Sequence, residues 1–453
     1  MLCSLARAGM DVARVPFAHG TLDEALRRVE RVRQTLPEVA ILADLPGPKI
    51  RTTSFPARGV RFATGDEVIL GSARAIPRSS RQAVGVALDD SELVLDAGQI
   101  VRLGDGDISF EVTEAKEGSI RTQVRDGGVA RGRPGITFPS SVPLSTPTEA
   151  DRRAAAELGA TDVDLVAVSF VRSAGDIQAI RSALGDSRAL AVAKIETTEA
   201  IENLAGILEV SDAVMVARGD LGVRVPLERV PRYQKQIIRE GVRFARPVIT
   251  ATQMLESMTS SLSPTRAEVT DVANAVLDGT SAVMLSGETA IGAHPIETVA
   301  TIASIVSYTE SYFDFNGWGA MLGPQEVSAP TRSAPRIAAA MTGAAWRAAL
   351  EEQVDAIVVW TRSGATARAL SRFRPPMPII AATSETTTAR QLALSWGVVP
   401  MLVPEVASID AAIEVSARAV VANGYVRAGG LVAVLLGPQG LGSHTDTLRL
   451  IVV

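Results

Sequence analysis

Charged side chains stand at the ends of short apolar runs, where they could bind a metal ion and an anionic substrate. Lys194 and Glu196 end one run, and Asp220 follows the next run along the chain. Residues two apart on a strand face the same side, so Lys194 and Glu196 would project together. Two carboxylates from neighbouring strands supply the oxygen ligands that magnesium prefers and leave positions open for substrate. The spacing therefore predicts a magnesium site beside a lysine, although a Lys–Glu pair alone also fits a solvated surface ion pair.

The segment around Asp220 is also suited to an anion. Gly219 and Gly222 would let the backbone approach a ligand closely, and a following helix would direct its free N–H groups toward a carboxylate. A tight strand-to-helix turn is the equally simple alternative. Thr252 ends the next apolar run, where it could face the same ligand or merely cap a helix.

These side chains require a frame of parallel strands, because the carboxyl ends of such strands meet at one edge. Short runs rich in Val, Ile and Ala recur with helical segments between them, which is typical of buried parallel strands joined by crossover helices. Eight such strands close a β/α barrel. The sequence has seven, so we expect a TIM-type barrel without its first strand, in a chain that opens inside a helix ending near Gly9. The seven runs are Val12 to Phe17, Ala40 to Leu45, Asp164 to Phe170, Leu190 to Glu196, Ala213 to Ala217, Pro247 to Gln253 and Ala282 to Gly287.

Two further regions depart from this pattern. Residues 54–142 alternate in short strands with glycine-rich turns, which predicts a β cap domain inserted in a βα loop. After a looser stretch from Asn316 to Pro335, β and α patterns alternate again, which predicts a C-terminal three-layer α/β domain over 333–453. The discontinuous barrel would then comprise residues 1–53 and 143–325.

Composition restricts the function classes. A net charge of −5 over 453 residues disfavours a general nucleic-acid binder, and no apolar run approaches the roughly 18 residues of a membrane helix. The single cysteine, Cys3, excludes a disulfide framework and a cysteine-based zinc site. The first ten residues lack the apolar core of a signal peptide. We therefore expect a cytoplasmic enzyme that acts on small anions, without nucleic-acid or membrane partners.

Taken together and in order, these motifs resemble the pyruvate kinase family from about Gly9 to Val453. Five long motifs, including Thr250 to Met258, Pro264 to Glu268 and Met284 to Ala290, fall at the expected strand ends. The resemblance implies phosphoryl transfer from phosphoenolpyruvate to ADP, which gives pyruvate and ATP, with Mg²⁺ or Mn²⁺ as cofactor. It also implies an allosteric, glycolytic homotetramer.

The resemblance further assigns roles to individual residues. Lys194 would stabilise the transferring phosphoryl group, Glu196 and Asp220 would hold the metal, and Thr252 would lie near the enolate carbon that is protonated. The other implied roles are the phosphate contacts of Arg14 and Arg51, the pyruvate carboxylate contact of Arg218, Gly219 and Asp220, and the nucleotide contact of His19 and Arg51. Positioning and charge neutralisation are what phosphoryl transfer needs most, so this set of charges is chemically apt.

The chain departs from the family at the potassium site. That site is built around Arg-x-Asn-Phe-Ser-His and Asp-Thr-Lys-Gly-Pro-Glu segments, which here read Arg14–His19 (RVPFAH) and Asp44–Lys49 (DLPGPK). Three of the four expected oxygens are absent, and Asp44 alone remains. The positions without a side-chain oxygen are Pro16, Ala18 and Leu45. Lys49 replaces the glutamate of potassium-requiring members, so we expect that K⁺ is not required.

Two more segments bear on activity and regulation. Pro134 replaces the cap-domain lysine of the family, although Arg133 is adjacent. The turn from Thr361 to Thr366 resembles the family's effector loop, because hydroxyls and backbone N–H groups at such a turn can bind a phosphorylated effector. An ordinary capped helix start is its alternative. The effector-loop residues are Thr361, Arg362, Ser363, Gly364 and Thr366.

Two other functions stay open at this point. A catalytically weak paralogue that binds phosphate metabolites would account for the altered potassium site and the absent strand. A metal-dependent pyruvate aldolase or lyase would also use a Glu–Asp metal pair, but it would need neither Lys194 nor the cap and C-terminal domains.

Overall fold

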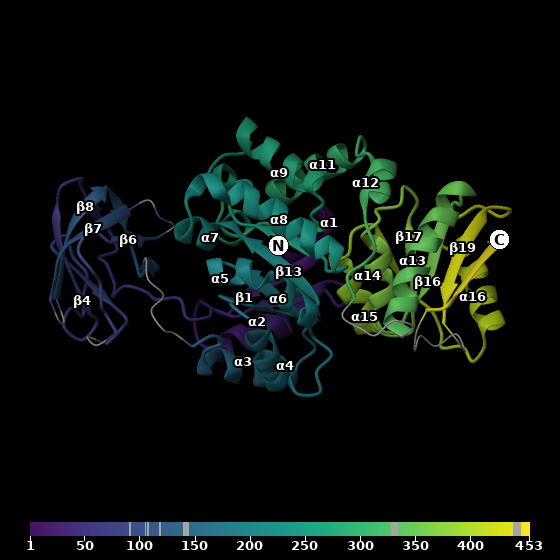
Figure 1. The fold of residues 1–453 in the computed structure, drawn as a ribbon, viewed down its shortest axis with the longest axis horizontal. Coiled ribbons are helices and arrows are strands. Elements are labelled where there is room, and N and C mark those ends of the chain that lie inside the picture. The colour runs from purple at the N-terminus through teal and green to yellow at the C-terminus, as the bar shows by residue number, and fades with distance from the viewer. Residues whose placement is uncertain are drawn as a thin grey trace.

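The computed structural model describes residues 1–89, 92–104, 106, 108–116, 119–138, 145–327, 334–437 and 445–453. Figure 1 shows three parts in a row along the longest axis: a β-rich part at one end, a helix-surrounded sheet in the middle, and an α/β part at the other end. The expected boundary between the cap domain and the second barrel segment, at residues 142 and 143, lies outside the described residues. No helix in the described part of the chain is long and apolar enough to cross a membrane.

The middle part is a curled parallel sheet of seven strands in the order β1-β2-β11-β12-β13-β14-β15. All seven lie within the expected apolar runs. Strands β2, β11, β13 and β14 are buried at every residue, which explains their nearly uniform Val, Ile and Ala composition. No ladder joins β15 to β1 among the described residues, so the sheet is an open half-barrel. The strands are β1 Val12–Pro16, β2 Ala40–Asp44, β11 Leu165–Val168, β12 Leu190–Ile195, β13 Ala213–Ala217, β14 Val248–Ala251 and β15 Ala282–Met284.

Helices connect and cover these strands. The first ends at Gly9, whose φ of 118° is the left-handed conformation expected of a glycine C-cap. Capping boxes begin four others, through Thr21 with Glu24, Thr148 with Asp151, Ser173 with Asp176, and Thr265 with Glu268. The helices are α1 Leu2–Ala8, α2 Leu22–Thr35, α3 Glu149–Gly159, α4 Ala174–Leu184, α5 Thr198–Glu202, α6 Leu204–Val210, α7 Arg218–Arg224, α8 Val230–Arg243, α9 Arg266–Asp278, α10 Gly287–Ala290, α11 Pro295–Glu310 and α12 Phe315–Met321.

The β-rich part follows β2 and precedes α3. Its six-stranded sheet runs in the order β10-β6-β7-β8-β4-β5, and β3 pairs with β9 beside it. Its core includes Phe62, which packs edge-to-face on Phe55 and Phe110. The strands are β3 Val60–Phe62, β4 Glu67–Ser72, β5 Ala83–Val86, β6 Ile100–Leu103, β7 Ile108–Lys116, β8 Ser119–Asp126, β9 Gly128–Ala130 and β10 Ile136–Thr137.

The C-terminal part is a five-stranded sheet in the order β18-β17-β16-β19-β20, with separate apolar clusters on its two faces. Four strands overlap apolar runs of the sequence, although β18 begins three residues before its run. The runs are Ala356 to Trp360, Ile379 to Ala382, Met401 to Val403 and Leu431 to Leu436. The fifth strand, β20, pairs antiparallel with β19 and was not expected. Helix α12 was also missed, since it lies in the stretch interpreted as a linker. The elements are α13 Ala334–Glu351, β16 Ala356–Trp360, α14 Ala365–Ser371, β17 Ile379–Thr383, α15 Thr386–Gln391, β18 Val398–Leu402, α16 Ile409–Ala422, β19 Leu431–Leu436 and β20 Thr447–Val452.

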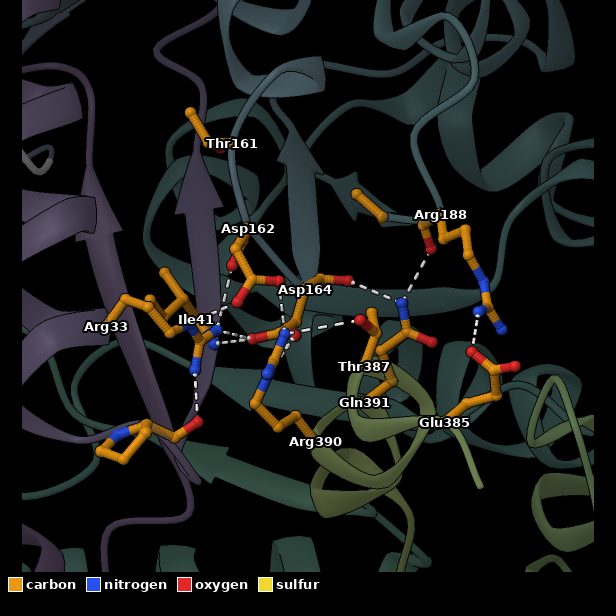
Figure 2. A network of polar contacts seen from close by, with 12 residues as sticks. Arg33, Ile41, Thr161, Asp162, Asp164, Arg188, Glu385, Thr387, Arg390 and Gln391 are labelled. Carbon is orange, nitrogen blue, oxygen red and sulfur yellow. Dashed lines mark hydrogen bonds and ion pairs between the residues drawn. The ribbon is translucent and has the colours of Figure 1, made fainter. Parts of the chain in front are cut away.

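A balanced set of charges joins the C-terminal part to the sheet. Figure 2 shows Arg33 from α2 and Arg390 from α15 both bound to Asp162 and Asp164. Asp164 is fully buried, and its contacts with the two arginines measure 2.5 and 2.7 Å. Because Asp164 directly precedes β11, this junction lies at the amino ends of the strands, away from their carboxyl ends.

Candidate active site

Lys194 lies at the centre of a cluster of charges at the carboxyl ends of the strands. Strand β12 places its ammonium 3.2 Å from Asp44 Oδ1 and 3.1 Å from Glu196 Oε1. It also donates a 2.7 Å hydrogen bond to Ser169 Oγ. Burial alone would lower the pKa of Lys194, but the attraction of the neighbouring carboxylates outweighs it and raises that pKa. The side chain is therefore a buried cation at neutral pH, as its expected role requires.

Asp44 connects Lys194 to Arg14. The Arg14 guanidinium lies 2.7 Å from Asp44 Oδ2, and the two residues pair in register on β1 and β2, offset by two positions. Burial would raise the pKa of Asp44, but Lys194 and Arg14 outweigh that effect and hold the pKa below its usual value. Asp44, which we expected to be the last ligand of a potassium site, is thus an ionised carboxylate that two cations already share.

Glu196 is the most enclosed carboxylate of the cluster. It is fully buried, and its Oε2 accepts a 2.6 Å hydrogen bond from the N–H of Phe170. Burial is the largest influence on the pKa of Glu196 and raises it; Lys194 opposes this shift and Asp220 adds to it. A carboxylate in this state gains from a further positive charge, which a divalent cation would provide.

Asp220 stands on the first turn of α7, where its Oδ1 lies 2.7 Å from the ammonium of Lys49. Both side chains are about 30% exposed, so the pair lies at the rim of the cluster. The sequence singled out both residues but did not predict that they would contact each other. A metal ion on Asp220 would therefore have Lys49 as its immediate neighbour.

The residues available to a metal are Glu196 and Asp220. No group of three or more metal-binding side chains occurs in the described part of the chain. The buried carboxylate oxygens Asp44 Oδ1 and Glu196 Oε1 face the Lys194 ammonium at 3.2 and 3.1 Å. Two anionic side chains, Glu196 and Asp220, fit magnesium, which retains water or substrate oxygens in most of its positions.

Thr252 and Gly219 meet beside this cluster. The N–H of Gly219 donates a 2.8 Å hydrogen bond to Thr252 Oγ1. Thr252 and Gln253 adopt positive φ angles of 68° and 53°, a strained conformation that often marks functional sites. The structure thus brings the two residues together at the carboxyl ends of the strands.

The side chain of Arg218 has a different task from its backbone. Its guanidinium makes two contacts with Asp271, at 2.6 and 2.8 Å, and donates to the carbonyl of Thr252 at 2.6 Å. It is therefore committed to holding the strained turn in place. Sequence reasoning did not single out Asp271 as its partner.

Arg51 and His19 lie toward the cap. Arg51 donates to the carbonyl of Arg133 at 3.2 Å. The pKa of His19 is lowered by burial first and then by Arg51 and Arg14, so these three residues share one electrostatic environment. A cleft of about 610 Å³ opens beside them between the sheet and the β-rich part, and Lys49, Asp220 and Arg224 line it.

The expected effector loop is a closed turn. The Thr361 hydroxyl accepts a hydrogen bond from the N–H of Gly364, and Thr366 shares one with Thr445. Arg362 is exposed, and its carbonyl accepts from Thr388. These contacts fit a capped helix start as well as a loop that presents its remaining groups to a ligand.

Ser169 is a site residue that the sequence did not single out. It links two strands, because its hydroxyl donates to the carbonyl of Leu45 at 2.6 Å while it accepts from Lys194. Its position near the end of the run Asp164 to Phe170 was the available signal.

Comparisons with known proteins agree with this geometry. Residues 1–299 match the model of the pyruvate kinase barrel domain, and residues 339–451 match that of the pyruvate kinase alpha/beta domain. The chain is 38% identical to a pyruvate kinase of Geobacillus stearothermophilus, over all of this chain and 77% of that protein. It is 39% identical to one from Thermococcus litoralis, over 88% and 85% of the two chains. It is 34% identical to one from Clostridium acetobutylicum, over 100% and 96%.

Proposed function

The chain belongs to the pyruvate kinase family, and we propose that it transfers the phosphoryl group of phosphoenolpyruvate to ADP, giving pyruvate and ATP. The observation that carries the proposal is the buried Lys194 ammonium, held within 3.2 Å of Asp44 and Glu196 at the carboxyl ends of the sheet. An aldolase or lyase would have no use for this cation, whereas a phosphoryl group in transfer requires one.

The chain's own residues perform the phosphoryl step by position and charge. Lys194 faces the phosphoryl group as a cation whose orientation Asp44, Glu196 and Ser169 have already fixed, so little reorganisation is needed during transfer. Arg14 is aligned by Asp44 and adds a second positive charge. Arg51, which we place at the cap side, contacts the phosphate and the nucleotide, with His19 nearby.

Glu196 and Asp220 would hold Mg²⁺ or Mn²⁺, which when bound neutralises phosphate charge and polarises the enolate oxygen that becomes the ketone. The remaining task, protonation of the enolate carbon, belongs to the side of the site where Thr252 lies. Gly219 would contact the pyruvate carboxylate only by exchanging its bond to Thr252 Oγ1 for one to substrate, which would also free the threonine hydroxyl.

Potassium independence is a further part of the proposal. Pro16, Ala18 and Leu45 offer no side-chain oxygen, and the carboxylate of Asp44 is already shared between Arg14 and Lys194. The ammonium of Lys49 lies at the rim of the same cluster. A bound K⁺ beside it would be repelled, and the tethered charge performs the same electrostatic task.

The broader proposals rest on family membership. They are a glycolytic role in the cytoplasm, a homotetramer, and regulation by a phosphorylated effector at the loop from Thr361 to Thr366. The domain limits proposed from the sequence are 1–53 with 143–325, 54–142 and 333–453.

The test is a coupled assay of pyruvate formation from phosphoenolpyruvate and ADP, in potassium and in tetramethylammonium at equal ionic strength. Magnesium-dependent turnover in both salts supports the whole proposal. Turnover only in potassium overturns the proposal that the enzyme does not require potassium. No turnover in either salt would favour the weak paralogue that binds phosphate metabolites.

A further inference from the structure

A second cleft lies at the amino ends of the strands, where the C-terminal part meets the sheet. It holds about 300 Å³ and is lined by Arg246, Arg368, Arg372, Arg374 and Trp396, among others. Arg246 comes from the turn between α8 and β14, whereas the other residues come from α14 and the segments after it. The site described above is at the opposite, carboxyl ends of the strands, so this cleft is separate from it.

The four arginines of this cleft have no ion-pair partner among the described residues. Their hydrogen bonds go to carbonyl oxygens instead: Arg246 to Leu208 and Glu209, Arg368 to Ser363, and Arg372 to Val242 and Gly323. The junction in Figure 2 differs, because Arg33 and Arg390 bind the carboxylates of Asp162 and Asp164 there. Burial lowers the pKa of Arg246 and of Arg368, and Asp212 opposes that shift. The Asp212 carboxylate already pairs with Arg181 at 2.5 Å, so the cleft carries more cations than carboxylates.

Two nitrogen atoms in the cleft are buried and unpartnered. They are Arg368 Nη1 and Arg372 Nε, in side chains that are 8% and 7% exposed. Arg368 and Arg372 lie four apart on α14 and its C-cap, and both line the cleft. Burial lowers the pKa of each to about 10, which still leaves both charged at neutral pH. Two buried charges with free donors in one cleft favour an anion there.

Arg374 does not share this need. Its guanidinium lies 5.0 Å from the ring centroids of Phe313 and Trp396 and 5.5 Å from that of Trp318. Its guanidinium N–H groups donate to the carbonyls of Val276 and Thr280. The aromatic rings and carbonyls therefore compensate Arg374, whereas Arg372, whose guanidinium lies 4.5 Å from the ring centroid of Phe373, keeps an unpartnered Nε.

We propose that this cleft binds a phosphate-type oxyanion, with Arg368 and Arg372 donating from the C-terminal part and Arg246 adding charge from the sheet side. The oxyanion is inorganic phosphate or the phosphoryl group of a small phosphomonoester, since planar guanidinium forks match its geometry. Because cations from both parts contact it, the ligand strengthens their association.

The test is isothermal titration of the full chain with inorganic phosphate, in chloride buffer at constant ionic strength. Phosphate will also occupy the substrate site, so the comparison is between variants that leave that site alone. Arg368→Met and Arg372→Met should each weaken one phosphate site per chain at least about tenfold, which equals about 1.4 kcal/mol. Arg362→Met, which alters the exposed arginine of the expected effector loop, is the matched control and should retain that site.

Each result decides the matter. Unchanged phosphate binding in both Arg368→Met and Arg372→Met overturns the proposal. A loss in Arg368→Met alone also overturns it, because Arg368 contacts Ser363 of the loop while Arg372 does not. Glycerol 3-phosphate in place of phosphate identifies the source: tighter binding by about tenfold or more indicates a phosphomonoester, and equal or weaker binding indicates inorganic phosphate.

Thermal unfolding separates this role from a structural one and does not depend on activity. In chloride alone, Arg368→Met should unfold no earlier than wild type, because it removes an unpaired buried charge. Phosphate should raise the unfolding temperature of wild type by more than it raises that of the variant. If either Met variant fails to fold, Arg372→Lys keeps the charge, removes the guanidinium fork and should still lose most of the phosphate effect. An equal phosphate effect in wild type and Arg372→Lys would contradict the proposal.

Discussion

Replacement of Lys194 by methionine tests the central contact of the site. The ammonium lies 3.1–3.2 Å from two buried carboxylates, which are 3% and 0% exposed. Its loss removes the cation that faces the phosphoryl group, and deletion of one preorganised electrostatic group typically costs about 10²–10³ in kcat. We expect a loss of that size, measured as pyruvate formation at saturating phosphoenolpyruvate, ADP and magnesium.

The same change should affect stability in a pH-dependent way. Arg14 still compensates Asp44, but Glu196 is left buried without its cation, and breaking such a pair costs about 3–5 kcal/mol. The pKa of Glu196 is already raised, and loss of Lys194 raises it further. A raised carboxyl pKa means that the folded state binds the extra proton, so stability is regained as pH falls and lost as pH rises through that pKa. The deficit in urea unfolding should therefore be smaller at about pH 5 than at about pH 8.

Two variants serve as controls. Lys194→Arg keeps the charge and should retain more activity and stability than the methionine variant. Lys235→Met removes an exposed surface lysine and should change neither. A folded Lys194→Met enzyme that keeps more than about a tenth of the wild-type rate, a difference under about 1.4 kcal/mol, would refute the role of this cation.

Further predictions concern the metal, potassium and the local pKa values. Glu196→Gln and Asp220→Asn should each raise the half-saturating magnesium concentration at least about tenfold; unchanged magnesium dependence in both would place the metal elsewhere. Activity should not depend on potassium, and Lys49→Glu should create a requirement or abolish turnover; activation of wild type by about tenfold or more would refute this. The pKa of Asp44 is lowered in the folded state, so wild type should be more stable than Asp44→Asn near pH 6 and lose this advantage as pH falls through that pKa. Urea unfolding from about pH 6 to about pH 3 measures the difference in unfolding free energy between the two proteins, and a constant difference would contradict the prediction. The imidazole of His19 should titrate in NMR below its usual value of about 6.5, and a normal value would contradict the arginine-rich surroundings.

The sequence predicted the frame of this protein well because the frame depends on local patterns. Buried parallel strands must be apolar at nearly every position, so all seven strands of the sheet were visible as runs. Strand β20 escaped because it is an edge strand with one neighbour, and its burial is only partial. Helix α12 escaped because its two glycines, Gly317 and Gly319, are poor helix formers, whereas the Asp314 cap and the packing of Trp318 stabilise it.

The site was predictable in membership but not in pairing, and the difference is physical. Strand order brings Asp44 and Lys194 together across 150 positions, yet no periodicity in the sequence says which carboxylate a lysine will choose. Lys49 shows what this means for function. It was expected to fill the place of a potassium ion, but its ammonium contacts Asp220, the residue proposed to hold the divalent metal. One side chain would then act on both cations, since a metal arriving at Asp220 must share that carboxylate with Lys49 or displace it. If Asp220 holds the divalent metal as proposed, the loss of potassium oxygens and the binding of magnesium would be coupled through one ion pair that only the folded chain reveals.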